Sequence, residues 1–241
     1  ERPDIFARRI VLPDPLYAAV AEIDERIGAD GTVHAVLDEA KARAALAQHF
    51  DAGLRSVAIV LMHGYRFTRH EAVLERIADE IGFTHISVSH RAAPLIKLIA
   101  RGDTCVADAY LSPVLRRFVS GLEAGLGPGV DALYMQSSGG LAKGDAFQGK
   151  DAILSGPAGG IVGMACVARE AGFDHVIGFD MGGTSTDVSH YAGSYERDNE
   201  TRVAGVRIRA PMMRIHTVAA GGGSVCHFDG AYEREQETTV A

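Results

Sequence analysis

The residues best suited to chemistry form one short run, Asp180 to Val188, with the sequence DMGGTSTDV. Two adjacent glycines lack a Cβ, so a turn there can point successive backbone N–H groups toward one spot, and such a nest binds phosphate oxygens. Three hydroxyl side chains follow as further donors. We predict that this turn binds phosphate rather than forming a plain surface hairpin, through Gly182, Gly183, Thr184, Ser185 and Thr186.

The two carboxylates that flank this turn, Asp180 and Asp187, imply a cation. Carboxylate and phosphate repel each other unless a cation lies between them. Mg²⁺ fits, because it takes one or two carboxylates together with phosphate oxygens and waters. Asp180 and Asp187 are therefore predicted as metal ligands and as catalytic residues. The two familiar glycine loops, GxxxxGK[ST] and a GxGxxG between strand and helix, are absent from the sequence.

Two other glycine-containing segments are candidate binding sites. Gly221, Gly222 and Gly223 follow an expected strand, so we predict a loop that faces nucleotide or substrate; the alternative is a flexible turn. Ser155 and Gly156 open an expected helix, whose N-terminus attracts anions, and are predicted to contact substrate. The alternative for Ser155 and Gly156, which explains the small residues equally well, is that they allow two helices to cross closely.

Two single residues complete the candidate set. His63 comes just after an expected strand, where α/β sheets bind ligands, and could be a general base or contact substrate. An ordinary polar residue at a strand end is the alternative. Arg101 could pair with a substrate carboxylate. The remaining histidines show no zinc-binding spacing.

The first half of the chain alternates expected helices with expected strands. Asp38 can cap the first helix, Thr68 and Glu71 form a capping box for the second, and Pro113 interrupts or kinks the third. Strands that alternate with long helices indicate a largely parallel sheet in an α/β fold. The expected helices are 38–52, 68–81 and 104–122, and the expected strands are 57–62, 85–89 and 132–136.

The second half changes character near residue 173. A small-residue helix is expected from Ser155 to about 171, and strands then dominate, at 175–180, 187–191, 202–208 and 213–219. We predict a boundary there, with 1–172 as the α/β part of a first lobe and 173–241 as the β-hairpin-rich start of a second. Residues 188–204 recur at 225–241 with ten of seventeen identities, for which we have no physical account.

Composition excludes several classes of protein. The 24 Lys and Arg against 31 Asp and Glu give a net charge of −7, which disfavours nucleic acid or an anionic membrane as partner. No apolar run is long enough to span a bilayer. Three widely spaced cysteines predict a reduced, cytoplasmic protein in which each cysteine is a packing residue.

Three motifs together resemble the hydantoinase A/5-oxoprolinase family. They are DMGGTSTDVS at 180–189, LSGPAGG at 154–160 and TVAAGGGS at 217–224. Further segments are more similar to the 5-oxoprolinases within that family than to the hydantoinases. These segments are RPD at 2–4, VLMH at 60–63, GFTH at 82–85, RGDT at 101–104, ADAYL at 107–111 and MQSSGGL at 135–141.

The resemblance implies a fold of sugar kinase/Hsp70/actin type, with ribonuclease H-like lobes that clamp ATP between two phosphate turns. Members of the family carry an earlier DxGGTxTD turn, which this sequence lacks. Complete 5-oxoprolinases are also several times longer. The chain is therefore expected to be a central fragment, whose partners are the remaining segments or a subunit of the parent enzyme, with a homodimer as a further possibility.

The implied activity is ATP-dependent opening of 5-oxoproline to glutamate, with release of ADP and phosphate. Asp180 and Asp187 would hold Mg²⁺, while Gly182, Gly183 and Thr184 would cradle the phosphates of ATP. One alternative is an ATP-dependent N-methylhydantoinase or a related carboxylase subunit. The other is a nucleotide-binding module that is inactive in isolation.

Overall fold

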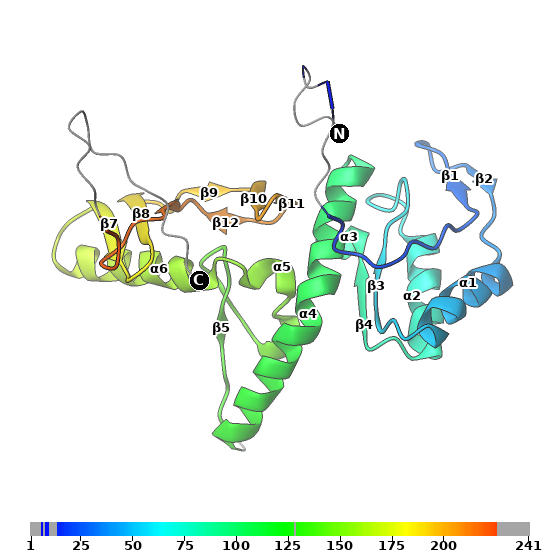
Figure 1. The fold of residues 1–241 in the computed structure, drawn as a ribbon, viewed down its shortest axis with the longest axis horizontal. Coiled ribbons are helices and arrows are strands. Elements are labelled where there is room, and N and C mark those ends of the chain that lie inside the picture. The colour runs from blue at the N-terminus through cyan, green and yellow to red at the C-terminus, as the bar shows by residue number, and fades with distance from the viewer. Residues whose placement is uncertain (1–5, 7, 10–13, 128, 226–241) are drawn as a thin grey trace. The chain divides into compact units, whose positions relative to one another are not determined.

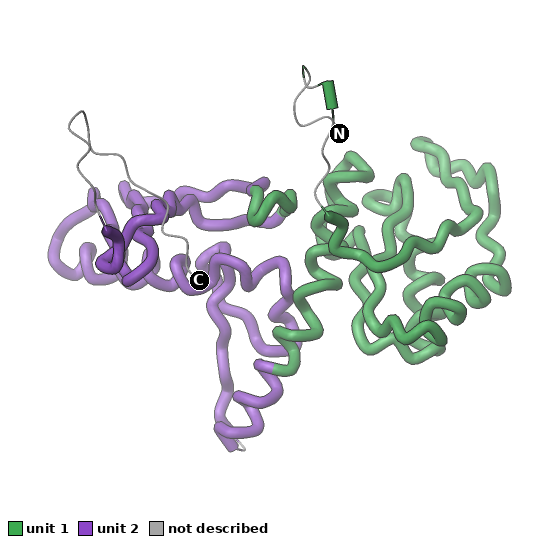
Figure 2. Tube along the Cα trace, in the orientation of Figure 1, with its two compact units in different colours: residues 1–117, 202–209 green, residues 118–201, 210–241 purple. Residues whose placement is uncertain are grey.

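The computed structural model describes the chain except for residues 1–5, 7, 10–13, 128 and 226–241 (Figure 1). The chain belongs to the mixed α/β class and forms two compact units. Unit 1 comprises residues 1–117 and 202–209, and unit 2 comprises residues 118–201 and 210–241 (Figure 2).

Unit 1 is built around two parallel strands, β3 (Ser56–Ile59) and β4 (His85–Val88), which are joined by helix α2 (Arg69–Ile81). Parallel neighbours need such a crossover connection, and the apolar run after residue 56 supplies β3, in which Ile59 is buried and the other residues are half-buried. Helix α1 (Glu39–Asp51) packs on α2. Their shared core consists of Leu37, Ala42, Leu46, Ile59, Leu74, Ile77, Ala78, Phe83 and Val88.

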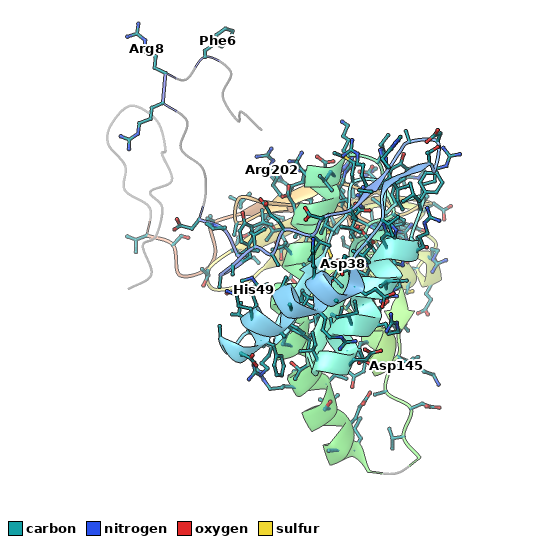
Figure 3. The ribbon with its side chains drawn as sticks, turned by 90° about the vertical axis from the view of Figure 1, so that its right-hand side faces the viewer. Phe6, Arg8, Asp38, His49, Asp145 and Arg202 are labelled. Atoms are coloured by element: carbon teal, nitrogen blue, oxygen red, sulfur yellow. The ribbon has the colours of Figure 1, made fainter. Side chains whose placement is uncertain are left out.

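The two helix starts predicted in unit 1 have different outcomes. Asp38 caps α1 as predicted, because its Oδ1 accepts hydrogen bonds from the amides of Ala40 and Lys41; Figure 3 shows Asp38 at one end of α1. The prediction of a capping box at the start of α2 is wrong. The side chain of Thr68 makes no capping hydrogen bond, and Glu71 is buried with other partners.

Helix α4 (Leu98–Leu126) is longer than the predicted 104–122 and continues through Pro113, so the predicted interruption there is wrong. Inside unit 1, it places Cys105 against the strands, with Sγ 3.2 Å from the carbonyl oxygen of Ser87. Burial raises the pKa of this thiol to about 12, so it remains protonated and unreactive. Cys105 is thus a packing residue as predicted. Cys166 is exposed, so the prediction is wrong there, and Cys226 lies outside the described residues.

The remaining elements of unit 1 are short. Strands β1 (Arg26–Ile27) and β2 (Val33–Ala35) form an antiparallel hairpin, and α3 (Ser89–Ala92) follows β4 directly. The single strand predicted over 202–208 is wrong. The chain turns there at Ala204, with φ 49°, so two strands form, β10 (Thr201–Val203) and β11 (Val206–Ile208).

Unit 2 contains a three-stranded antiparallel sheet in the order β13-β8-β7. Its strands are β7 (His175–Met181), β8 (Thr186–Ala192) and β13 (His216–Val218), and helix α6 (Ser155–Glu170) packs on β7 and β8. The rest of the unit comprises β5 (Tyr134–Met135), β6 (Leu141–Ala142), the 3-10 turn Gly144–Ala146, α5 (Gly149–Ala152), β9 (Arg197–Asp198) and β12 (Met212–Met213).

The parallel sheet is smaller than predicted. Within the described part of the chain, β3 and β4 are the only parallel pair, and the predicted strand at 132–136 pairs antiparallel with β6 instead. The reason is a reversal at Gly139, whose φ of 82° suits glycine, closed by the amide of Gln136 donating to the carbonyl of Gly140 at 2.8 Å.

Three further expectations concern the chain as a whole. The lobe boundary at residue 172 stays a prediction. The second copy of the internal repeat, 225–241, lies almost entirely outside the described residues. Among the helices of the described residues, none is both long and apolar enough to cross a membrane.

Candidate functional site

The hairpin of β7 and β8 brings the two predicted metal ligands together. In the antiparallel register, Asp180 lies directly opposite Asp187, next to the turn. Side chains at opposed positions have their Cβ atoms about 4.5–5.5 Å apart, and like charges there repel each other. The two carboxylates therefore repel each other when no cation is bound, and a cation shared between them would remove this repulsion.

The third strand of the sheet fixes one of the two carboxylates. Thr217 of β13 lies opposite Asp187, and its hydroxyl donates a hydrogen bond of 2.7 Å to Oδ1 of Asp187. Asp180, in contrast, is exposed to solvent at the end of β7. One carboxylate of the pair is thus held in place while the other faces solvent.

The turn between the strands presents consecutive backbone donors. The amide of Gly182 donates to the carbonyl of Ser185 at 2.9 Å, which closes the turn. Among the described residues, none accepts a hydrogen bond from the amides of Gly183, Thr184 and Ser185. Three successive N–H groups beside two carboxylates are the donors that a metal-bound phosphate requires.

The second glycine cluster packs against this turn. The amide of Gly222 donates to the carbonyl of Gly182, and the amide of Gly223 donates to the carbonyl of Gly183, each at 2.9 Å. The amide of Gly221 donates to Oγ of Ser224, also at 2.9 Å. This placement favours a supporting role for Gly221–Gly223, because all three of their amides are already used. Contact of this loop with nucleotide stays a prediction.

Thr186 is also committed to supporting the turn. Its side chain is buried, and its hydroxyl donates to the carbonyl of Ala220 at 2.6 Å. Thr184 is exposed and Ser185 half-buried, so of the three hydroxyl residues these two are better placed for a ligand.

Gly221→Ala should destabilise unit 2, whereas Gly222→Ala should not. A Cβ on Gly221 would lie 2.6 Å from the carbonyl oxygen of Gly182, which is backbone and cannot move aside easily, while a Cβ on Gly222 would lie at an ordinary 3.8 Å from the same atom. We expect Gly221→Ala to cost about 1–3 kcal/mol of unfolding free energy, as overpacking does. Urea denaturation of the two variants measures the difference; equal midpoints would contradict the close packing of the two glycine segments.

The predicted substrate contacts Ser155 and Gly156 lie at the start of α6. The helix begins at Ser155 with no side-chain cap on the preceding Leu154. Ser155 is half-buried and Gly156 is exposed. The first amides of this helix are therefore not satisfied by a capping side chain, and the substrate role of both residues stays a prediction.

Arg101 is buried inside unit 1, with 0% of its surface exposed. Its Nε donates to Oγ of Ser89 at 2.9 Å, Nη1 to the carbonyl of Leu95 at 3.0 Å, and Nη2 to the carbonyls of Leu61 and Met62. Burial lowers its pKa. Four of the five guanidinium N–H donors are thus used within the unit, which favours a structural role over the predicted contact with substrate.

His63 follows β3 at the carboxyl end of the parallel pair. Its Nδ1 is buried and has no hydrogen-bond partner among the described residues, while its carbonyl accepts from the amides of Arg66 and Phe67. The predicted role as base or substrate contact therefore stays a prediction.

Two functional candidates at this end of the strands were missed by sequence reasoning, Glu71 and His90. Glu71 is 0% exposed; its Oε1 accepts from the amide of Leu61 at 2.9 Å and from Oγ of Ser89 at 2.6 Å. Its Oε2 contacts the amide of His90 at 3.1 Å and Nδ1 of the same residue at 2.7 Å. The signal at Glu71 was interpreted as a capping box, and nothing in the sequence marked His90.

The chemistry of the Asp180–Asp187 pair fits Mg²⁺ only if other ligands complete the shell. Across the part of the chain that the structure describes, no group of three or more His, Cys, Asp or Glu side chains could hold a metal ion. Mg²⁺ does not require one, since it commonly binds one or two carboxylates and takes waters and substrate phosphates for the rest.

Comparison with known proteins gives two family matches. Residues 101–237 match the family described as Hydantoinase/oxoprolinase, and residues 1–82 match the Hydantoinase/oxoprolinase N-terminal region. Among curated proteins, 5-oxoprolinase of Saccharomyces cerevisiae is 41% identical over 93% of this chain, and 5-oxoprolinase 1 of Arabidopsis thaliana is 42% identical over 92%. The chain spans 20% and 19% of the lengths of these two proteins.

Solved structures show the same similarity. The ATP-dependent caprolactamase of Pseudomonas jessenii superposes with a TM-score of 0.78 and 30% identity, covering 95% of this chain and 35% of the caprolactamase chain. Nucleotide-free acetone carboxylase superposes with a TM-score of 0.71 and 25% identity, covering 88% of this chain and 32% of the carboxylase chain.

Proposed function

Because the chain belongs to the hydantoinase/oxoprolinase family, we propose that it is part of an ATP-dependent enzyme that opens 5-oxoproline to glutamate. The observation that carries the proposal is the turn of unit 2, where three amides without partners among the described residues lie beside the opposed carboxylates of Asp180 and Asp187. The choice of 5-oxoproline as the substrate is supported by relatives named 5-oxoprolinase, which are similar to this chain to about the same degree in yeast and in a plant.

We further propose that the turn is one of two phosphate turns in a fold of sugar kinase/Hsp70/actin type. Residues 1–172 would then belong to the first lobe and residues 173–241 would begin the second. Support comes from the strand–turn–strand form of the site, which differs from loops that lead from a strand into a helix. The rest of the enzyme would supply the other turn and most of the nucleotide pocket.

The chain's own residues would act on the phosphates of ATP. Asp180 and Asp187 would hold Mg²⁺ or its waters, and the ion would neutralise charge on the transferring phosphoryl group. The amides of Gly183, Thr184 and Ser185 would donate to phosphate oxygens and hold the group in line. Phosphorylation of the lactam oxygen activates a poor electrophile, so that water can add to the ring carbon and the C–N bond can break.

The proposal is tested by phosphate release from MgATP by the complete enzyme, with 5-oxoproline, N-methylhydantoin and caprolactam as separate substrates. We expect release to depend on 5-oxoproline. Stimulation by N-methylhydantoin alone would favour a hydantoinase, and stimulation by none of the three would leave a nucleotide-binding module or a carboxylase subunit. The last alternative has support, since the gamma subunit of acetophenone carboxylase from Aromatoleum aromaticum is 29% identical over 93% of this chain.

Calorimetry on this chain alone separates binding from catalysis. With only one of the two proposed turns, we expect MgADP and MgATP to bind weakly and ATP hydrolysis to be absent.

The widely spaced cysteines favour action in the cytoplasm. The chain spans only 20% of the length of the yeast 5-oxoprolinase, which favours the remaining segments of the enzyme as the main partner, with self-association as an alternative.

A further inference from the structure

Unit 1 holds a second arrangement suited to chemistry, the pair formed by Glu71 and His90. Both residues lie at the carboxyl ends of the parallel strands β3 and β4, the edge where open α/β sheets bind ligands. The side chain of Glu71 is fully buried, whereas that of His90 is 15% exposed. A buried carboxylate thus touches an imidazole that reaches the surface.

The hydrogen bonds around Glu71 decide which imidazole nitrogen carries the proton. The amides of Leu61 and His90 can only donate to the carboxylate. Oγ of Ser89 already accepts from Nε of Arg101, so its own proton is available for the bond to Glu71. Glu71 is therefore an acceptor at these three contacts. An ionised Glu71 also accepts at the fourth contact, which makes Nδ1 of His90 the donor there.

A proton fixed on Nδ1 leaves the lone pair of a neutral histidine on Nε2. No described residue forms a hydrogen bond with that Nε2. A carboxylate that fixes the tautomer of a histidine in this way is a recurring feature of general-base sites. The nearby His63 does not share this support, because its Nδ1 is buried without a partner among the described residues.

Resting on the function proposed above, we propose that His90 is the proton-transfer residue of the ring opening and that Glu71 is its positioning residue. Nε2 of His90 removes a proton from water as the water oxygen bonds to the phosphorylated ring carbon. The same proton then passes from Nε2 to the ring nitrogen, which has kept its own hydrogen, as the C–N bond breaks. The remaining hydroxyl proton leaves to solvent as the carbonyl re-forms, so the products are an acyl phosphate, a free amine and the neutral imidazole. A second water hydrolyses the acyl phosphate to carboxylate and phosphate.

The sharpest variant is His90→Asn in the complete enzyme. The Asn amide can keep the hydrogen bond to Glu71 but offers no nitrogen lone pair, so the unit should stay folded while the base is lost. We expect kcat for 5-oxoproline-dependent phosphate release to fall by about 10²–10⁴-fold, the usual contribution of a general base. KM should change by no more than about threefold, because only the chemical step is affected.

A matched control exists in the same unit. Nδ1 of His70 contacts Oε2 of Glu25 at 2.6 Å, with side-chain exposures of 10% and 6%, so His70→Asn changes a similar buried pair. We expect this variant to keep its kcat. If His90→Asn kept full activity, or if both variants lost it equally, the proton-transfer role would be overturned and the pair would only tie α2 to the end of β4.

The tautomer is measured independently of activity. Nitrogen-15 shifts of the histidines in this chain, assigned by the loss of one signal in His90→Asn, should show a protonated Nδ1 and an unprotonated Nε2 at neutral pH. Glu71→Gln should shift that balance toward Nε2–H. The opposite tautomer in the unchanged chain would overturn the inference. If the enzyme without any substitution showed no 5-oxoproline-dependent activity, the proposed function would be contradicted instead.

Discussion

Asp180→Asn should abolish most of the ATP-dependent activity of the enzyme while leaving this chain folded. Asp180 is exposed at the end of β7, opposite Asp187, so its carboxylate contributes charge rather than packing. Asp180 would hold the Mg²⁺ that neutralises the transferring phosphoryl group, and loss of one such electrostatic contribution typically costs about 10²–10³-fold in kcat. Steady-state phosphate release measures this loss, and calorimetry with MgATP should show weaker binding.

In the ligand-free chain, Asp180→Asn should not lower stability. Removing one of two opposed carboxylates relieves repulsion, so we expect urea unfolding to be unchanged or slightly harder, by about 0.2–1 kcal/mol. Asp174→Asn is the control, since Asp174 is exposed just before the same strand and outside the turn. A drop in stability with nucleotide affinity preserved would show that Asp180 is a structural residue.

Arg101→Met should produce the largest loss of stability in unit 1. The substitution keeps much of the side-chain length but removes the donors to Ser89 and to the carbonyls of Leu61, Met62 and Leu95. It also removes a positive charge that interacts with the buried carboxylate of Glu71. Breaking a buried charge network by removing one partner costs about 3–5 kcal/mol.

Chemical denaturation of the chain tests this expectation against Arg117→Met. Arg117 lies on the same helix α4 and is exposed, so its substitution should change the unfolding free energy by less than about 0.5 kcal/mol. If the two variants unfolded at the same denaturant concentration, the hydrogen bonds of Arg101 would contribute nothing to stability.

The sequence predicted the fold best where local signals and burial agree. The Asp38 cap, the strands at 57–62 and 85–89, and the strand–turn–strand at 175–191 are all present, the first strand shorter than expected. The turn with Asp180 and Asp187 was predictable because a Gly-Gly pair between two strand-like runs is typical of a tight turn.

The errors share one physical cause, which is that tertiary contacts override local patterns. Thr68 and Glu71 have the spacing of a capping box, yet Glu71 is drawn inward by four donors from Leu61, Ser89 and His90. Arg101 was interpreted by its charge, and its burial depends on carbonyls that no sequence pattern reveals. The surroundings of Glu71 and of Arg101 are both formed by residues that lie apart in the sequence.

The packing of the second glycine segment on the turn has a consequence for ligand binding. In a planar trans peptide, the C=O of one residue and the N–H of the next point in opposite directions. Because the carbonyls of Gly182 and Gly183 are held by Gly222 and Gly223, the N–H groups of Gly183 and Thr184 must face away from that segment. The donors are thus aimed before any anion arrives, and little backbone ordering remains to oppose its capture.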